Sequence, residues 1–165
     1  MLIRPERGRD PPGIHDLVDR AFRPMAFSDG TEPAVVDRLR RRGELALSLV
    51  AESDGAVVGH VAFSPASVRP SDVSGWYALG PVAVDPPLQR TGIGTALIDE
   101  GLRTLRERGA RGVVLIGDPA YYGRFGFVGD GRLRYRDLPD GIAQWLAFGT
   151  PPPSGELRFS DAFDP

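Results

Sequence analysis

The spacing of apolar residues changes from helical to strand-like along this chain. Ile14, Leu17 and Val18 recur at helical spacing after Asp10-Pro11-Pro12, and an N-cap followed by prolines is typical of a first helical turn. We expect a second helix to begin after Thr31, with a solvated arginine-rich outer face. Its inward positions are Val35, Val36 and Leu39.

Strand patterns follow this helical region. The runs Leu45–Glu52 and Ala56–Phe63 are joined by Ser53-Asp54-Gly55, and Asp-Gly between apolar runs is a strong hairpin signal. A short first strand is expected at Leu2–Arg4. Ser64–Ser74, rich in Pro and Ser, reads either as a loop or as an extension of the preceding strand.

The middle of the chain predicts a strand, a helix and a second strand. Trp76–Val84 reads as a buried strand, and Ile93–Arg108 carries one continuous apolar stripe, ended by Gly109 and Gly112. Val113–Ile116 is short and fully apolar, as expected in a sheet covered on both faces. The pattern therefore indicates an α/β (α+β) domain with a mixed sheet.

The last third is less regular. Asp118-Pro119 should start a short helix, again as a cap followed by proline. Leu157 and Phe159 alternate with polar neighbours and suggest a late strand. We treat residues 1–165 as one domain, with residues 129–165 as a C-terminal strand and loop extension of it.

Composition narrows the classes of function. A net charge of −2 argues against a general nucleic-acid or anionic-membrane binder. The absence of cysteine excludes disulfides, cysteine-bound metal and thiol catalysis, and we expect no metal site. The absence of lysine excludes a Walker A phosphate loop. The N-terminus lacks an apolar run, so no membrane partner and a cytoplasmic location are expected.

The most informative stretch runs from Leu79 to Leu97, where a strand enters a glycine-containing turn and a helix begins at once. The start of a helix has free backbone N–H groups and a partial positive charge, and glycines let an anion approach the main chain closely. This arrangement predicts a phosphate site that needs no lysine. Gly92-Ile93-Gly94 is followed by Leu97 rather than a third glycine, so the dinucleotide-binding fingerprint is not met. A purely structural turn is the alternative interpretation.

Gln89-Arg90-Thr91-Gly92-Ile93-Gly94 resembles the Q/R-x-x-G-x-G/A signature of GNAT acetyltransferases, and it follows a strand that ends in Val82-Ala83-Val84. The resemblance implies a GNAT-like domain with helices on both faces of a mostly antiparallel sheet, which splays to admit acetyl-CoA. It implies that Val82, Ala83 and Val84 lie along the pantetheine arm, with Val82 and Val84 bonded to it through their backbones. The implied pyrophosphate ligands are the amides of Gln89, Arg90, Thr91, Gly92, Ile93, Gly94 and Thr95.

Gly80-Pro81 fits a splayed sheet for a local reason. Proline has no N–H to give to a strand ladder, so pairing should fail there or a bulge should form. The resemblance covers about residues 1–128 in element order.

The stretch Gly117–Phe127 is similar to the second CoA segment of the same family: a strand, a short helix with a tyrosine, then Gly-Phe. The resemblance implies that Tyr122 protonates the departing CoA thiolate, since a tyrosine keeps its proton at neutral pH. Tyr121 is the second choice for this acid, and both could instead be core aromatics. Asp118 stands where many relatives have an asparagine, and we interpret it as a helix cap.

Acetyl transfer to an amine also needs a route for the amine proton. Several relatives place a glutamate on the strand before the phosphate turn, whereas this strand begins Trp76-Tyr77-Ala78-Leu79 without a carboxylate. His60 on the preceding strand is the first candidate base, although a lone histidine there is more often a buried structural residue. Glu32 and Glu52 come next, His15 after them, and a water chain is an equal alternative.

We therefore predict an N-acetyltransferase that moves an acetyl group from acetyl-CoA to a primary amine by direct attack. A small-molecule amine is favoured over a peptide, and the alternatives are a protein N-terminal or lysine acetyltransferase and a non-catalytic CoA-binding sensor. Phe27 and Tyr77 either wall the acceptor pocket or belong to the core, where we expect Trp76. Trp145 and Phe148 either close the site or pack between two copies, so a homodimer stays open.

Overall fold

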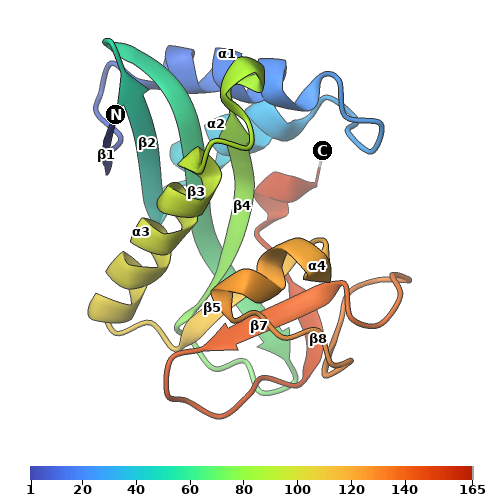
Figure 1. Ribbon diagram of the computed structural model, residues 1–165. Coiled ribbons are helices and arrows are strands. Elements are labelled where there is room, and N and C mark those ends of the chain that lie inside the picture. The colour runs from blue at the N-terminus through green and yellow to red at the C-terminus, as the bar shows by residue number, and fades with distance from the viewer. Residues whose placement is uncertain (165) are drawn as a thin grey trace.

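One sheet organises the molecule. The computed structural model describes residues 1–164. The strands run in the order β1-β2-β3-β4-β5-β7, and β8 pairs with both β3 and β6 (Figure 1). Every pairing is antiparallel except β4 with β5 and β6 with β8. The strands are β1 Leu2–Pro5, β2 Leu47–Ser53, β3 Ala56–Arg69, β4 Trp76–Val84, β5 Gly112–Ile116, β6 Leu133–Arg134, β7 Ala143–Ala147 and β8 Gly155–Arg158.

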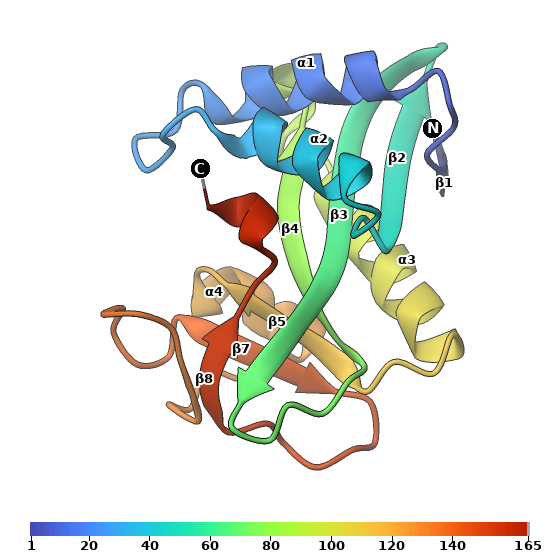
Figure 2. The ribbon, with the colours of Figure 1, turned by 180° about the vertical axis from the view of Figure 1, so that it is seen from behind.

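Helices cover both faces of this sheet, as the sequence predicted. Helix α1 (Pro11–Phe22) and helix α2 (Glu32–Arg41) lie on one face, and helix α3 (Ile93–Glu107) lies on the other (Figures 1 and 2). The short helix α4 (Pro119–Tyr122) lies on the same side as α3. None of the helices formed by residues 1–164 is both long enough and apolar enough to cross a membrane.

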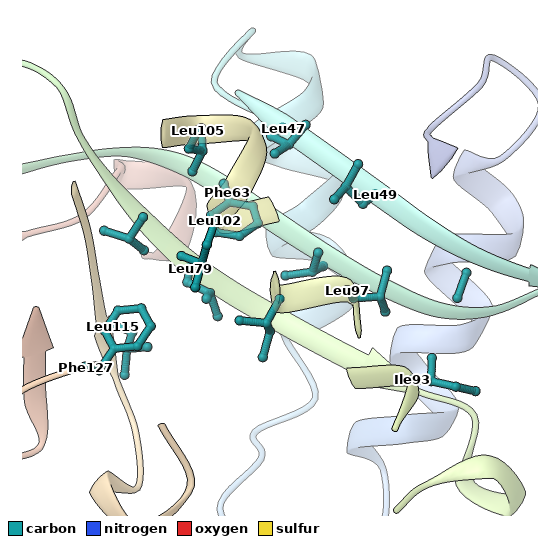
Figure 3. Packing of buried hydrophobic residues seen from close by; sticks show 14 of the residues in the cluster. Leu47, Leu49, Phe63, Leu79, Ile93, Leu97, Leu102, Leu105, Leu115 and Phe127 are labelled. Atoms are coloured by element: carbon teal, nitrogen blue, oxygen red, sulfur yellow. The ribbon is translucent and has the colours of Figure 1, made fainter. Parts of the chain in front are cut away.

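Helix α3 packs very closely on the sheet because two glycines make room for large neighbours. A Cβ at Gly101 would lie 2.3 Å from the ring of Phe63, and a Cβ at Gly59 would lie 2.8 Å from Ile93. Phe63 and Leu97 are fully buried at the centre of this layer (Figure 3). The close contact holds α3 rigidly on β3, so the start of α3 has a fixed position beside the end of β4.

The long strand β3 joins two parts of the molecule. Its first part pairs with β2 and β4, and Ser67–Arg69 pairs with β8 near the C-terminus. The extension interpretation of Ser64–Ser74 is thus correct as far as Arg69. Leu157 lies in β8 as expected, but Phe159 follows that strand. Through this pairing the end of the C-terminal segment (residues 132–164) is carried back to the face that α1 and α2 cover, where the turn Asp161–Phe163 lies beside α2 (Figure 2).

Several local predictions need correction. Strand β7 was not predicted, and Gly112 begins β5 rather than ending α3. Asp10 does not cap α1 with its side chain, because its carboxylate accepts hydrogen bonds from the Arg4 guanidinium and the Arg7 amide. The aromatic side chain of Trp145 packs in the core cluster beneath β7.

The arginine-rich face of α2 is less solvated than expected, since Arg38 donates to the Ala162 carbonyl and Arg40 pairs with Glu6. Trp76 is buried in the core and Tyr77 packs against it, as one of the two alternatives stated. Phe148 also packs against the core cluster under α3.

Candidate active site

The site begins where two neighbouring strands separate. Strand β4 pairs with β5 only through Trp76, Tyr77 and Ala78, although β4 continues to Val84. On its other edge β4 stays paired with β3 as far as Val84. Residues 79–84 therefore form a strand with one paired edge and one open edge, which is the splayed sheet that the sequence predicted.

A bulge marks the point of separation. Val61 is opposite Val82 and Phe63 is opposite Leu79, so β4 has one residue more than β3 in this interval. The extra residue falls at Gly80-Pro81, as the missing proline N–H predicted. Gly80 has a φ of +134°, a conformation that suits glycine and no other residue, and no atom would meet a Cβ there within 4 Å.

The pairing pattern fixes the direction of the peptide groups beyond the bulge. The Asp85 amide donates to the Val58 carbonyl at 2.9 Å, and hydrogen-bonded and non-hydrogen-bonded pairs alternate in an antiparallel ladder. Ala83 is therefore bonded to its partner on β3, whereas the N–H and C=O groups of Val82 and Val84 point to the open edge. These two residues offer main-chain bonds to an extended ligand, and Ala83 offers none.

The start of α3 closes one end of this open edge with unbonded amides. The first amide used within the helix is that of Ala96, which donates to Gly92. No side chain caps the helix, and within residues 1–164 no acceptor bonds to the amides of Ile93, Gly94 or Thr95. Gly92 has a φ of +96°, which a glycine adopts readily. Three parallel N–H groups at a helix start form an anion site made entirely of main chain.

Gln89 has a second role that sequence reasoning missed. Its side-chain amide donates to the Val84 carbonyl at 3.1 Å, so the turn and the open edge of β4 are tied together. Only the backbone amide of Gln89 was predicted to act, and this amide already bonds to the Pro86 carbonyl. No sequence signal distinguishes a glutamine that binds through its backbone from one that holds a neighbouring carbonyl.

Two tyrosines form the opposite wall of the site. Asp118 caps α4 by accepting from the Ala120 amide at 2.9 Å, as predicted. Helix α4 then presents Tyr121 and Tyr122, whose rings meet edge to face at 4.9 Å. Gly117 makes room for Tyr122, because a Cβ at residue 117 would lie 2.5 Å from its ring. Tyr121 points toward the start of α3: its hydroxyl is 3.4 Å from the position of a Cβ on Gly94.

The environment of Tyr122 keeps its hydroxyl protonated. Burial, with a smaller contribution from the neighbouring Tyr121, raises the pKa of Tyr122 to about 12, because both disfavour the phenolate. Tyr122 is therefore a proton donor throughout the neutral range. For Tyr121 the Arg124 guanidinium lies over the ring at 4.4 Å, on the outer side of the wall.

One cleft of about 950 Å³ runs along β4 from Ala78 to Val84 and past both tyrosines, and residues from both faces of the sheet line it. Gln89 is the lining residue nearest in sequence to the start of α3. The α3 side of the cleft contains Val84, Gln89, Tyr121 and Tyr122. We call the opposite part the α1–α2 side. It is mostly apolar and contains Phe22, Met25, Phe27, Glu32, Tyr135, Arg136, Phe159, Phe163 and Asp164.

The C-terminal segment supplies most of the α1–α2 side. Tyr135 and Phe159 contact at 5.0 Å between ring centroids, and Phe159 and Phe163 at 5.6 Å. Arg136 donates to Asp164 at 2.7 Å. From residues 129–165 only Trp145 and Phe148 were predicted as residues that could close the site, and neither lines the cleft. The residues that do line it were not predicted, because their position depends on the pairing of β8 with β3.

The candidate bases lie in different places. Glu32 lines the cleft, whereas His60, Glu52 and His15 do not. His60 is fully buried, and its Nε2 is 2.8 Å from the Ser48 hydroxyl, which itself donates to Glu6 at 2.8 Å. Burial lowers the pKa of His60 to about 4, so it is neutral at physiological pH. Glu52 pairs with Arg4, and His15 pairs with Asp37 on the outer surface of α1.

Nowhere in residues 1–164 do three histidine, cysteine, aspartate or glutamate side chains gather in an arrangement suited to a metal ion.

Comparisons with known proteins agree with this geometry. Residues 12–127 match the family described as the Acetyltransferase (GNAT) family. The uncharacterized N-acetyltransferase YhbS of Escherichia coli K12 is 45% identical over 128 residues, which are 77% of this chain and 73% of YhbS.

Two solved structures extend the similarity to nearly the whole chain. A GNAT family acetyltransferase of Brucella melitensis, crystallised with acetyl-CoA, is 47% identical with a TM-score of 0.87 and covers 99% of this chain and 97% of its own. YhbS of Escherichia coli, crystallised with CoA, is 36% identical with a TM-score of 0.87 and covers 99% and 92%. The chain belongs to the GNAT family of acetyltransferases and is an acyltransferase of that family.

Proposed function

We propose that this protein transfers an acetyl group from acetyl-CoA to the primary amine of a small molecule. The observation that carries the proposal is the open edge of β4, where the Val82 and Val84 peptide groups point into the cleft and lead to the uncapped start of α3. An extended pantetheine arm can bond to the first, and a diphosphate to the second. Similar proteins crystallised with acetyl-CoA and CoA support the same assignment.

The residues present fit acetyl-CoA, and they divide its binding between them. We infer that the amides of Ile93, Gly94 and Thr95 hold the diphosphate, with the preceding turn of Arg90 to Gly92 wrapping it. Gln89 acts on the cofactor indirectly by holding the Val84 carbonyl. We infer that the Val82 N–H, which faces the open edge, donates to the thioester carbonyl, and a donor fixed in this way can stabilise an oxyanion without reorganisation.

Tyr122 is proposed as the general acid of the reaction. The amine nitrogen forms a bond to the acetyl carbon, the carbon–sulfur bond breaks, and the leaving sulfur takes a proton from the Tyr122 hydroxyl. The phenolate cannot persist in this buried position, since its pKa is raised to about 12, so it regains a proton that the attacking nitrogen loses.

The main test combines binding with turnover. Calorimetry should show that acetyl-CoA and CoA bind, and a panel of amines and peptides should show which acceptors release free CoA. A protein that binds CoA tightly but acetylates no acceptor would favour the non-catalytic sensor. A preference for peptides over every small amine would favour a protein acetyltransferase. Absence of binding to acetyl-CoA would refute the proposal.

A further inference from the structure

The carboxylates that line the cleft differ in whether a cation or a helix amide is bonded to them. Among the carboxylates that line the cleft within the described residues, Asp118 caps α4 and Asp164 accepts from Arg136 at 2.7 Å. Glu32 also lines the cleft, but within residues 1–164 no arginine, histidine or terminal amine lies within ion-pair distance of it. Glu32 is thus the carboxylate of the cleft that still lacks both a cation and a capping role.

The local structure orients Glu32 without consuming both of its oxygens. The Ser28 hydroxyl donates to one oxygen, Oε1. The Gly30 amide donates to the Ser28 oxygen at 3.0 Å, so the hydroxyl proton is left for Glu32. Within residues 1–164 the other oxygen, Oε2, has no hydrogen-bond donor. A carboxylate held on one side and free on the other is arranged to receive a ligand.

The surroundings of Glu32 are apolar. Phe22 and Met25 from α1 and the loop after it line this part of the cleft, as do Phe159 and Phe163 from the C-terminal segment. Phe27 is 79% exposed at the mouth and meets Phe22 edge to face at 6.4 Å. A large aromatic ring left so exposed contributes little to folding, but it can cover an apolar ligand. The neighbouring Asp29 adds a second negative charge beside Glu32, and a carboxylate among apolar groups is unfavourable unless a cation joins it.

From these observations we infer that the acceptor is a monoamine in which a single ammonium group is attached to an apolar body, and that Glu32 binds the ammonium. This inference rests on the proposed acetyl transfer and names its substrate class. The apolar body would lie among the aromatic rings. Within the lining of the cleft a polycation would find one carboxylate without a cation, since the neighbouring Asp29 lies outside the lining and accepts from the Thr31 amide and hydroxyl. A compound with its own carboxylate would face Glu32, while the Arg136 guanidinium is already paired with Asp164.

Glu32 would then bind the amine as its ammonium ion, which is the main form of the amine in neutral water, and hold it near the acetyl group. The bound ammonium releases one proton to solvent along the exposed mouth, and the neutral nitrogen attacks. The nitrogen–carbon bond forms, the carbon–sulfur bond breaks, and the second proton of the nitrogen is balanced by the one that Tyr122 gives to sulfur. The products are the N-acetyl compound, free CoA and one proton, so the neutral amide loses its attraction to Glu32 and can leave.

The first test compares three acceptors at saturating acetyl-CoA: 2-phenylethylamine, the polycation kanamycin and γ-aminobutyrate. We expect kcat/KM for 2-phenylethylamine to exceed both others by about tenfold or more, since only it matches one charge and an apolar body. A preference for kanamycin or γ-aminobutyrate would overturn the inference, as would turnover of none of the three by a protein that binds acetyl-CoA.

The second test uses variants of the same residue and its support. Glu32→Gln should lower kcat/KM for 2-phenylethylamine roughly ten- to a hundredfold, mainly through KM, with acetyl-CoA affinity unchanged. Glu107→Gln, an exposed substitution on α3, is the matched control and should change neither value. Ser28→Ala should have a smaller effect in the same direction. If Ser28→Ala equals Glu32→Gln, Glu32 only holds the loop and the inference is wrong.

A third variant addresses the apolar body. Phe27→Ala should fold normally, because its ring is mostly exposed, and should raise KM for 2-phenylethylamine several-fold while leaving KM for methylamine unchanged. Equal effects on both amines would contradict the aromatic contact. Calorimetry with acetyl-CoA distinguishes failure of the monoamine inference from failure of the proposed acetyl transfer. If the unsubstituted protein does not bind acetyl-CoA, both are wrong; if it binds, a negative result in the amine tests refutes only the inference.

Discussion

The two sides of the cleft are built on different principles. On the α3 side the groups that face the ligand are mainly peptide N–H and C=O groups, held by the β3–β4 ladder and by the tight seat of α3. On the α1–α2 side they are side chains from a loop and from the C-terminal segment. Peptide N–H and C=O groups are the same whatever the side chain, so the α3 side can persist when the sequence changes. The lining of the α1–α2 side changes with each substitution of its side chains. A protein built this way can keep one cosubstrate and change the other.

The largest effect is expected from removing the Tyr122 hydroxyl, which is the side-chain group on the α3 side that is proposed to take part in the chemistry. Tyr122→Phe should lower kcat by about 10²–10⁴-fold with acetyl-CoA affinity nearly unchanged, because it removes the proton donor and keeps the ring. Steady-state kinetics measure this. Tyr121→Phe is the matched control and should keep most of the activity. Unchanged turnover by Tyr122→Phe would refute the acid assignment.

The pH dependence follows from the same residue. Because its pKa is raised to about 12, well above the usual 10, Tyr122 should keep its proton up to pH 10 and beyond. The rate at saturating substrates should therefore show no loss on the alkaline side up to pH 10. A descending limb centred below pH 10 that disappears in Tyr122→Phe would contradict the raised pKa.

The main-chain anion site can be blocked without weakening the fold. Gly94→Asp places a carboxylate among the free amides of α3, where it stabilises a helix start but repels a diphosphate. The backbone there suits any residue, since Gly94 does not have a positive φ. We expect acetyl-CoA affinity to fall about a hundredfold or more in calorimetry, with an unchanged melting temperature.

The matched control for Gly94→Asp is Ala34→Asp, the same change in the first turn of α2. It should leave acetyl-CoA affinity as it was. If Gly94→Asp binds acetyl-CoA normally, the diphosphate lies elsewhere and the main-chain description of the α3 side is wrong.

His60 tests whether a residue outside both sides of the cleft takes part in the chemistry. Its pKa is about 4 in the folded protein and near 6.5 when unfolded, so the unfolded chain binds more protons between these values. The contribution of His60 to the free energy of unfolding is therefore fully present above pH 6.5. It is lost as the pH drops toward 4, by roughly 3 kcal/mol in total. His60→Leu should remove this part of the pH dependence of unfolding.

His15→Leu, which removes the other histidine of the chain, is the control and should keep the dependence, because His15 is half exposed. Turnover separates the two roles of His60. A buried structural residue predicts that His60→Leu keeps most of its activity at pH 7.5 and low temperature, whereas a base predicts a loss of about a hundredfold.

The smallest effect is expected from removing the Gln89 side chain, which bonds to the main chain of β4. Gln89→Ala frees the Val84 carbonyl from its side-chain bond and loosens the link between the turn and the open edge. We expect acetyl-CoA affinity to fall about fivefold, the equivalent of one ordinary hydrogen bond. Thr104→Val, which removes a side-chain bond to a carbonyl within α3, should have no effect. An unchanged affinity in Gln89→Ala would mean that the edge is held by β3 alone.

The same contrast explains what could be predicted from the sequence. The α3 side follows from local rules: Gly80-Pro81 breaks a ladder, and Gly92 precedes a helix without a cap. Each of these features is encoded within a few residues, so the interruption of the ladder was predicted correctly, and an uncapped helix start is present where the anion site is expected. The fold class was predicted from apolar periods that are long and regular, whereas the helices on both faces of the sheet were what the family resemblance implied.

The α1–α2 side could not be found in this way. Phe159, Phe163 and Asp164 reach the cleft only because β8 pairs with the far end of β3, about ninety residues earlier in the chain. Strand β7 was missed although Pro139-Asp140-Gly141 before it and Gly149 after it are turn signals, because Ala143–Ala147 is only five residues long and lacks a regular apolar alternation. For His60, burial and its bond to Ser48 depend on where three separate elements meet, so its residue type alone suggested a base.

The three residue pairs that join β8 to Ser67–Arg69 have a practical consequence. They make residues 155–164 a short terminal cassette, fastened to β3 by a seam that begins beyond the bulge and to β6 by two further pairs. A chimera that exchanges this cassette with that of a relative would keep every amide beside the thioester and present a new set of rings and charges to the amine. Substrate choice in such enzymes could then be engineered by recombination at one junction, with no redesign of the catalytic strand.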